Sequence, residues 1–320
     1  MVYGAGAIGG VAGARLFRAG LPVVLVARGA HLAAIRRAGL VLRSPEGAES
    51  FAIPAVADPS EIELRGDEVV LLATKSQDAS AALEALRDAA GAAVPVVCLQ
   101  NGLESARLAL RRFERVLGAM LVLPTSHLEP GVVLEHSAPV PGIIDLGRFP
   151  SGAGDFAETV AADLRRAGFV SEVRAEIQPW QWAKLLTNLL NALHAACGPD
   201  ADFGELPAAL RAEGEACLRA AGIPFVDAAQ FAARSKGVVR LVPIEGQARG
   251  GGSSWQSLAR GTGSIEADFL NGEIALLGRS HGIATPLNAA LQALAGRLAR
   301  ERRPPASLSV AELRAALGAR

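Results

Sequence analysis

Cysteine, aromatic residues and a surplus of either charge are all scarce in this sequence. Its three cysteines are too few and too scattered for a disulfide framework or a zinc site, so no metal is expected, and Cys98 lies in an apolar run typical of a core. Acidic and basic residues balance at 32 each, which argues against nucleic acid or an anionic membrane as a partner. No apolar run approaches the roughly 20 residues of a membrane-spanning helix, and no leader pattern opens the chain. A cytoplasmic protein is expected.

Lysine is also rare. Of the 32 basic residues only Lys75, Lys184 and Lys236 are lysines, and arginine supplies the rest. Arginine stays charged at any useful pH, whereas burial can lower the pKa of a lysine until it exchanges its proton. In a chain that otherwise uses arginine, a lysine therefore marks a place where arginine would not serve.

The first half of the chain alternates short apolar runs with helical patterns. Strands are predicted at 22–27, 68–74 and 95–100, and a small hairpin over 40–56. Because these apolar runs are nearly continuous, the strands suit a parallel sheet that helices cover on both faces. Residues 1–172 are therefore expected to form a Rossmann-type, doubly wound α/β domain.

The second half, residues 173–320, has the pattern of an all-α domain. The run Gly250–Ser254 predicts a loop inside it rather than a linker between domains. Helices are predicted at 179–196, 205–221, 225–236, 264–280 and 286–303, with a last one after Ser309.

A glycine-rich turn opens the chain after a strand that only three residues can form. The motif Gly4-x-Gly6-x-x-Gly9 precedes a helical pattern, as in a strand–turn–helix unit that binds the pyrophosphate of a dinucleotide. The predicted cofactor-binding residues are Gly4, Gly6 and Gly9, with Ala7 and Ile8 between the last two. Their backbone allows the pyrophosphate to approach closely, and the N-terminus of the helix then faces it. The alternative is an ordinary turn in a chain with 35 glycines.

The end of the next strand selects the form of the cofactor. NAD-binding sites carry an acidic residue there, which holds the ribose 2′-hydroxyl. This strand ends in Arg28, with no carboxylate, which favours NADP through its 2′-phosphate, and His31 or Arg36 are candidates to assist. The alternative is a solvated arginine at a strand end.

Three polar residues line one side of the predicted helix 179–196. Lys184, Asn188 and Asn191 are spaced four and three apart, so they share a face, while leucines occupy most of the remaining circumference. A helix that is apolar on most sides is buried, and the polar face then lines a ligand site. The alternative is a solvent-facing stripe, against which two asparagines argue mildly.

A second polar motif lies at 263–272. Ser264 is predicted to cap a helix whose first turn contains Glu266 and Asp268, where acids complement the helix dipole. Asn271 and Gly272 are poor helix formers inside a helical pattern. Such local violations often mark close packing or a functional site.

Together these residues resemble the ketopantoate reductase (2-dehydropantoate 2-reductase) family over nearly the whole chain. The resemblance rests on the order and separation of the opening glycine turn, Lys75, Gln100-Asn101-Gly102, Trp182-Ala183-Lys184 with Asn188, and Ser264–Asp268 with Asn271-Gly272. It implies an NADP-binding domain over 1–172, a substrate domain over 173–320, and reduction of 2-dehydropantoate to pantoate by NADPH, a step of pantothenate biosynthesis.

The resemblance also implies roles for single residues. Lys184 would be the catalytic lysine and Glu266 would hold the substrate hydroxyls. The cofactor would contact Arg28, Lys75 and Asn101, and the substrate Asn188, Asn191 and Ser254. Chemistry supports the first role, because hydride addition leaves negative charge on the ketone oxygen, and a lysine can both stabilise that charge and supply a proton.

The sequence departs from the family pattern after Lys184. The second substrate-side asparagine of the family often lies eight residues after this lysine, whereas Asn191 lies seven after it, and Ala192 stands where proline is common. Two alternatives therefore stay open: an NADP-dependent oxidoreductase of another hydroxy or keto acid, and a non-catalytic NADP-binding regulatory protein. A small keto acid is the expected partner, and the terminal helices leave a homodimer open.

Overall fold

The computed structural model describes residues 1–64, 66–247 and 250–318 and divides into two compact units. The first contains residues 1–181 and 228–249, and the second contains 182–227 and 250–320. This division differs from the boundary expected at 172/173. The difference arises because 173–181 and 228–247 pack with the first unit rather than with the helices that surround them in sequence.

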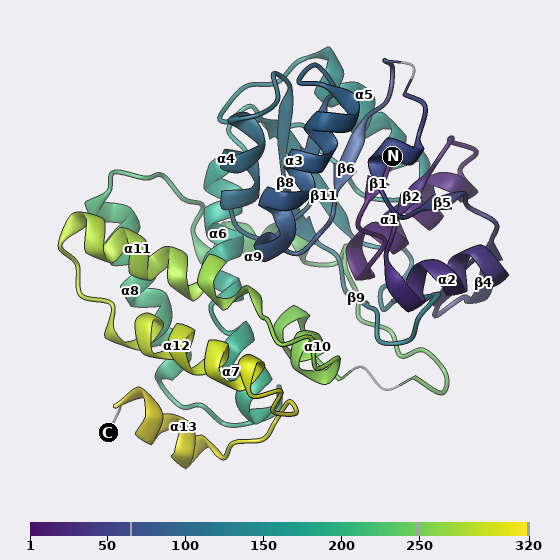
Figure 1. The fold of residues 1–320 in the computed structure, drawn as a ribbon. Coiled ribbons are helices and arrows are strands. Elements are labelled where there is room, and N and C mark those ends of the chain that lie inside the picture. Colours follow the sequence, from purple (N-terminus) through teal and green to yellow (C-terminus); the bar gives the residue numbers. More distant parts are fainter. Residues whose placement is uncertain (65, 248–249, 319–320) are drawn as a thin grey trace. The chain divides into compact units, whose positions relative to one another are not determined.

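The first unit is built on a seven-stranded sheet with the order β11-β8-β7-β6-β1-β2-β5 (Figure 1). Six neighbouring strands are parallel, and only the edge strand β11 runs antiparallel, against β8. The strands are β1 (Val2–Tyr3), β2 (Leu25–Val26), β5 (Ala55–Val56), β6 (Val70–Leu72), β7 (Val96–Cys98), β8 (Val116–Val122) and β11 (Ile143–Arg148). The strand order reverses at β1, as in the doubly wound fold predicted from the sequence, which is confirmed.

The central strands are shorter than the apolar runs that predicted them. β1 offers only Val2 and Tyr3 for pairing, opposite Leu25 and Val26 of β2. A strand extends only as far as its backbone finds partners, so the predicted strand 22–27 is reduced to its paired residues.

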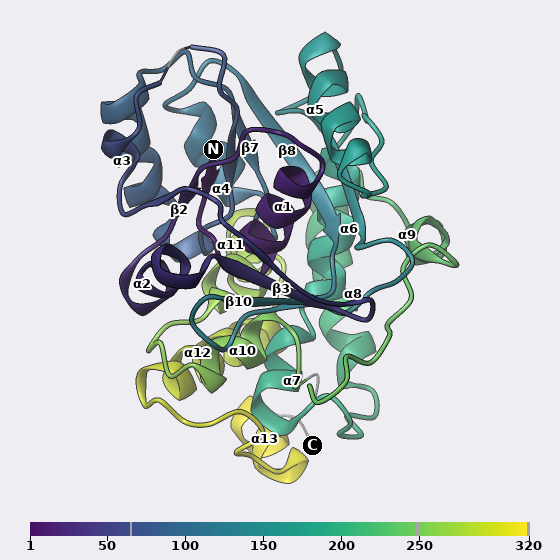
Figure 2. The same ribbon diagram turned by 90° about the vertical axis from the view of Figure 1, so that its right-hand side faces the viewer.

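Helices cover both faces of this sheet. Figure 2 shows α3 and α4 on one side, and α1 and α5 on the other. Their bounds are α1 (Ala7–Arg18), α2 (Gly29–Ala38), α3 (Ala79–Ala90), α4 (Glu104–Leu110) and α5 (Asp155–Arg166), with the short 3₁₀ helices η1 (Pro59–Glu61) and η2 (Ser76–Asp78). Side chains of α1 and α5 belong to one buried cluster with residues of the sheet, and Cys98 lies in the sheet, where burial raises its thiol pKa to about 12.

A second, four-stranded sheet packs against α1 with the order β4-β3-β10-β9. Its strands are β3 (Leu40–Ser44), β4 (Gly47–Phe51), β9 (Thr125–Ser126) and β10 (Val132–Glu135). β3 and β4 form the predicted hairpin. The parallel pairing of β3 with β10 was not predicted, since it joins segments about ninety residues apart in the chain.

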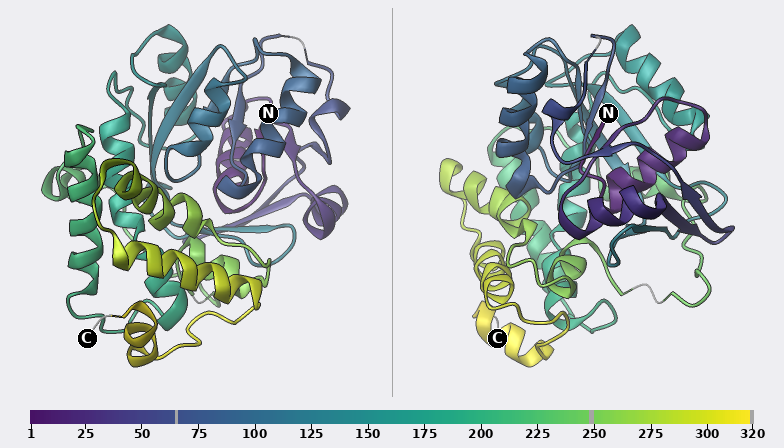
Figure 3. Two further views of the ribbon diagram at one scale, coloured as in Figure 1. Left: turned by 60° about the vertical axis from the view of Figure 1, so that its left-hand side comes forward. Right: turned by 45° about the vertical axis from the view of Figure 1, so that its right-hand side comes forward.

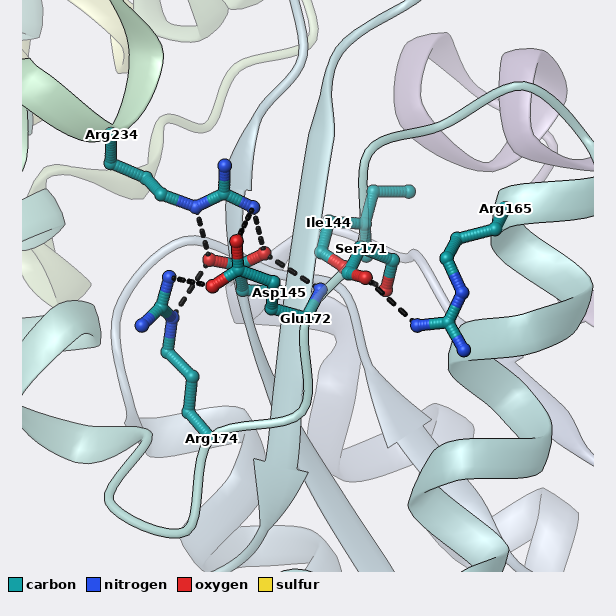
Figure 4. A network of polar contacts seen from close by, with 7 residues as sticks. All are labelled: Ile144, Asp145, Arg165, Ser171, Glu172, Arg174 and Arg234. Atoms are coloured by element: carbon teal, nitrogen blue, oxygen red, sulfur yellow. Dashed lines mark hydrogen bonds and ion pairs between the residues drawn. The ribbon is translucent and has the colours of Figure 1, made fainter.

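The fully buried carboxylate of Asp145 attaches α9 (Ala228–Ser235) to β11 (Figure 4). Arg234 of α9 donates to it twice, at 2.8 Å and 2.7 Å, and Arg174 donates once, at 2.8 Å. The backbone N–H of Glu172 adds a fourth bond at 3.0 Å. This pairing supplies the partners that a buried charge needs, and it connects α9 to the first unit.

The described part of the second unit consists of helices and connecting loops, coloured from teal to yellow in Figure 3. The helices are α6 (Gln178–Asn188), which begins in the first unit, α7 (Asn191–Cys197), α8 (Leu206–Ala220), α10 (Ser253–Ala259), η3 (Glu266–Phe269), α11 (Asn271–His281), α12 (Pro286–Arg300) and α13 (Val310–Leu317). The predicted helical half is confirmed. None of the helices within the described ranges combines the length and apolarity required to cross a bilayer.

Three local predictions for this unit were wrong. The helix expected over 179–196 is interrupted at Leu189–Leu190, and 253–254 begin helix α10 rather than ending a loop. Ser264 caps no helix, because a 3₁₀ turn starting at Glu266 precedes α11.

Candidate active site

The glycine turn between β1 and α1 is tight enough to exclude side chains. Gly4 has a positive φ of 102°, and a Cβ there would lie 2.7 Å from the backbone nitrogen of Thr74. A Cβ on Gly9 would lie 2.0 Å from the carbonyl oxygen of Gly4. At Gly6, in contrast, a Cβ would meet open space. The turn therefore packs tightly on its inner side and leaves Gly6 accessible to a ligand.

The amino end of α1 fits an anion. Its first helical hydrogen bond runs from the Gly10 N–H to the Gly6 carbonyl at 2.7 Å, so the N–H groups of Ala7, Ile8 and Gly9 precede the helical ladder. In the described chain no side chain caps this helix, and its first turn contains no acid. Free N–H groups and the helix dipole together favour a phosphate at this position.

Three further predicted residues follow parallel strands of the same sheet. Arg28 is the exposed N-cap of α2 after β2, Lys75 precedes η2 after β6, and Asn101 follows β7. Because parallel strands end at the same edge of a sheet, these residues share that edge with the glycine turn, where ligands of open α/β sheets bind. A hydrogen bond of 3.4 Å from Gln100 to Thr74 connects two of the loops.

Arg28 is exposed, whereas Arg36 and His31, the two residues proposed to assist it, are bound to other parts of the protein. Its charge contributes to lowering the pKa of the nearby Asp58, although the main cause of that lowering is the hydrogen bond from the Ser60 backbone. Arg36 is bound elsewhere, to the carbonyl of Ala55 at 2.9 Å and to Glu61 at 3.3 Å. His31 contacts the backbone of the glycine turn. Arg28 thus remains the candidate for a 2′-phosphate.

In the second unit, Lys184 lies on α6 among buried leucines. Its side chain is half-buried, and burial lowers its pKa to about 8. Within the described residues no carboxylate forms an ion pair with it. An ammonium group without a counter-ion in such surroundings exchanges its proton near neutral pH.

Two other predicted residues carry buried polar atoms that lack partners. Asn188, on the same helix, is 5% exposed, and Ser254, in the first turn of α10, is 2% exposed. Neither the Asn188 Nδ2 nor the Ser254 Oγ has a hydrogen-bond partner among the described residues. Leaving such a group unpaired costs about 1–3 kcal/mol, so both atoms are suited to a ligand. Asn191 lies beyond the interruption, on α7, which packs against α10.

Glu266 is buried and held by a residue that the sequence analysis did not single out. Ser253, the neighbour of Ser254 in α10, donates its hydroxyl to the Glu266 carboxylate at 2.8 Å. Burial lowers the pKa of the Arg260 guanidinium, and the negative charge of Glu266 opposes that effect. The consecutive serines therefore differ: Ser253 orients Glu266, and Ser254 keeps an unpartnered hydroxyl.

Asn271 explains why α6 ends at Asn188. Its side-chain amide donates to the carbonyl of Leu189 at 3.2 Å, inside the interruption, and to Asn288 at 3.0 Å. Asn288 in turn donates to Glu213, whose carboxylate also accepts the N–H groups that begin α12. The asparagine that contradicts the helical pattern thus binds a carbonyl released by the end of α6. Sequence reasoning identified Asn271, but nothing in the pattern indicated Glu213 or Asn288.

The predicted residues therefore form two sets. The first unit brings the glycine turn, Arg28, Lys75 and Asn101 to one edge of its sheet. The second unit places Lys184 and Asn188 on α6 and Ser254 on α10 beside α7. Of the described residues, no group of histidines, cysteines and acids could hold a metal ion.

Comparison with known proteins gives a consistent result for both units. The family model described as Ketopantoate reductase PanE/ApbA matches residues 1–151, and that of its C-terminal part matches 176–299. The 2-dehydropantoate 2-reductase of Mesorhizobium japonicum is 32% identical over 94% of this chain and 98% of its own.

Solved structures agree. A PanE/ApbA family ketopantoate reductase from Ralstonia eutropha JMP134 is 30% identical, with a TM-score of 0.77 over 95% of this chain and 100% of its own. D-mandelate dehydrogenase in its complex with NADH and anilino(oxo)acetate has a TM-score of 0.78 over 94% of this chain and 99% of its own, but at 21% identity it shows a shared fold only. From the family models and the relatives of 30% identity and more, this chain belongs to the ketopantoate reductase family.

Proposed function

We propose that this protein is a cytoplasmic 2-dehydropantoate 2-reductase that uses NADPH to reduce the C2 ketone of its substrate to the alcohol of pantoate. The observation that carries the proposal is Lys184, a half-buried ammonium group with a pKa lowered to about 8. It lies on the same helix as Asn188, whose amide nitrogen has no hydrogen-bond partner among the described residues. The relatives named 2-dehydropantoate 2-reductase, which align over both units, support this substrate.

The first unit would hold the cofactor. The N–H groups at the start of α1 suit the pyrophosphate, and the open space at Gly6 allows its close approach. Arg28, at the end of β2 where NAD-binding sites carry an acid, suits a 2′-phosphate, which favours NADPH. Lys75 and Asn101 would bind near the nicotinamide. When bound, NADPH supplies the hydride.

The second unit would carry the substrate chemistry. A charged Lys184 stabilises the negative charge that develops on the ketone oxygen and then donates a proton to it. The amide of Asn188 and the hydroxyl of Ser254 can donate to oxygen atoms of the keto acid, which would satisfy both groups. Asn191 is a further donor on α7. The carboxylate of Glu266, oriented by Ser253, would accept from a substrate hydroxyl.

A substrate panel tests this proposal. NADPH consumption at 340 nm would be followed with 2-dehydropantoate, with aliphatic 2-keto acids that lack its hydroxyl, and with aryl 2-keto acids. We expect the highest kcat/KM for 2-dehydropantoate, because only a substrate with a hydroxyl can donate a hydrogen bond to the Glu266 carboxylate. Preference for a keto acid without a hydroxyl would assign another substrate. Binding of NADPH without turnover of any of them would favour a regulatory protein.

A further inference from the structure

The imidazole of His31, in the first turn of α2, is fixed by backbone groups on two sides. The backbone N–H of Gly131 donates to its Nδ1 at 2.8 Å. An Nδ1 that accepts a hydrogen bond carries no proton, so the proton of the neutral ring is on Nε2. Nε2 lies 2.7 Å from the carbonyl oxygen of Ala5 and therefore donates to it. The contacts alone determine the tautomer.

Ala5 lies inside the glycine turn, between Gly4 and Gly6. Its backbone N–H donates to the carbonyl of Val26 in β2 at 3.3 Å, and its carbonyl accepts from His31. Because a trans peptide is planar, a carbonyl and the N–H of the next residue point in opposite directions. With the Ala5 carbonyl held toward His31, the N–H of Gly6 must point away from it. His31 therefore sets the orientation of the peptide at the residue that leaves open space for a ligand.

The loop between β9 and β10 of the four-stranded sheet contacts His31. The ring of His127 lies 4.2 Å from that of His31, measured between centroids, and its Nδ1 lies 3.0 Å from the carbonyl of Val132 at the start of β10. The same strand carries the buried Glu135, which pairs with Arg15 of α1. β10 thus contacts the helix that follows the turn, and the loop that precedes β10 contacts His31.

We propose that His31 is a positioning residue for dinucleotide binding: as a neutral imidazole it holds the Ala5 peptide so that the glycine turn presents its N–H groups to the pyrophosphate. This inference rests on the proposed cofactor. It replaces the expectation that His31 contacts the 2′-phosphate. A role at the pyrophosphate, which NADPH and NADH share, affects both dinucleotides alike, whereas a role at the 2′-phosphate affects NADPH alone.

The test is a titration of His31→Ala, His31→Gln and the parent protein with NADPH and with NADH, without keto acid, followed by nucleotide fluorescence. For His31→Ala we expect both dissociation constants to rise by a similar factor, about tenfold, the effect of losing one well-placed hydrogen bond. His31→Gln, whose amide can donate to Ala5 and accept from Gly131, should recover part of the affinity. Arg36→Ala is the matched control, because it removes backbone and ion-pair contacts of the same helix, and it should change neither constant.

Kinetics separate positioning from a general loss of structure. At saturating NADPH, His31→Ala should keep kcat and the KM for the keto acid within about twofold of the parent values. Unchanged affinity for both dinucleotides, or a loss confined to NADPH, would overturn the inference. So would a parent protein that binds neither dinucleotide. A parent protein that binds both but reduces no keto acid would refute the proposed activity and leave the role of His31 standing. If His31→Ala does not fold, the dissociation constants of His31→Gln are compared with those of Arg36→Ala. Weaker binding of both dinucleotides by His31→Gln than by Arg36→Ala supports the inference, and equal binding by the two variants overturns it.

Discussion

The glycine turn of the first unit and the region of α6 and α10 in the second differ in how their polar groups are partnered. In the glycine turn of the first unit, the Ala5 carbonyl and N–H and both ring nitrogens of His31 have partners within the protein. Around α6 and α10 of the second unit, the Asn188 Nδ2 and the Ser254 Oγ are buried without hydrogen-bond partners among the described residues, and Lys184 has a lowered pKa. The turn is therefore preformed for its ligand, whereas α6 and α10 carry buried polar groups whose desolvation a bound ligand can offset.

The largest effect is expected at Lys184. Lys184→Ala removes both the charge and the proton donor, so kcat should fall by at least about a hundredfold, while the dissociation constant of NADPH, which depends on the first unit, should not change. Lys184→Arg is the control that keeps the charge but donates a proton poorly, and its kcat should also be low. Turnover of Lys184→Ala near that of the parent would remove this residue from the mechanism.

The next effect concerns the choice of cofactor. Arg28→Ala should raise the dissociation constant of NADPH by about tenfold or more, because a charge-assisted contact with the 2′-phosphate is lost. The constant for NADH should change little, since NADH lacks that phosphate. Titrating both cofactors into the variant measures the ratio. An equal loss of affinity for both cofactors would show that Arg28 supports the turn and does not bind the 2′-phosphate. Arg28 would then have the same role as the one proposed for His31.

The smallest effect is expected at Ser254, and it tests most sharply how α6 and α10 differ from the glycine turn. Ser254→Ala deletes a buried hydroxyl that has no partner in the described chain, so the free protein should become more stable, by about 1 kcal/mol. The same change should raise the KM for the keto acid several-fold. Thermal unfolding and kinetics on one preparation measure both. Ser253→Ala is the matched control: its hydroxyl has a partner in Glu266, so the stability of this variant should fall.

Much of this architecture could be predicted from local sequence. The apolar run at 68–74 indicated a buried parallel strand, and the glycine turn indicated both a helix start and an anion site. The interruption of α6 could not be predicted, because it depends on Asn271, which lies 82 positions from the carbonyl it binds. The role of His31 depends on Gly131, 100 positions away. Tertiary hydrogen bonds of this kind leave no periodic pattern in the sequence.

One measurement tests the central claim most directly: the pH dependence of kcat for reduction by NADPH. Lys184 must be protonated to donate, and burial lowers its pKa to about 8. We expect a constant kcat below that pH and a fall of about tenfold per pH unit above it. Oxidation of the product needs the neutral amine, so its kcat should rise by about tenfold per pH unit below that pH and level off above it. A kcat for reduction that stays constant from pH 7 to about pH 10, where an ordinary lysine titrates, would contradict it.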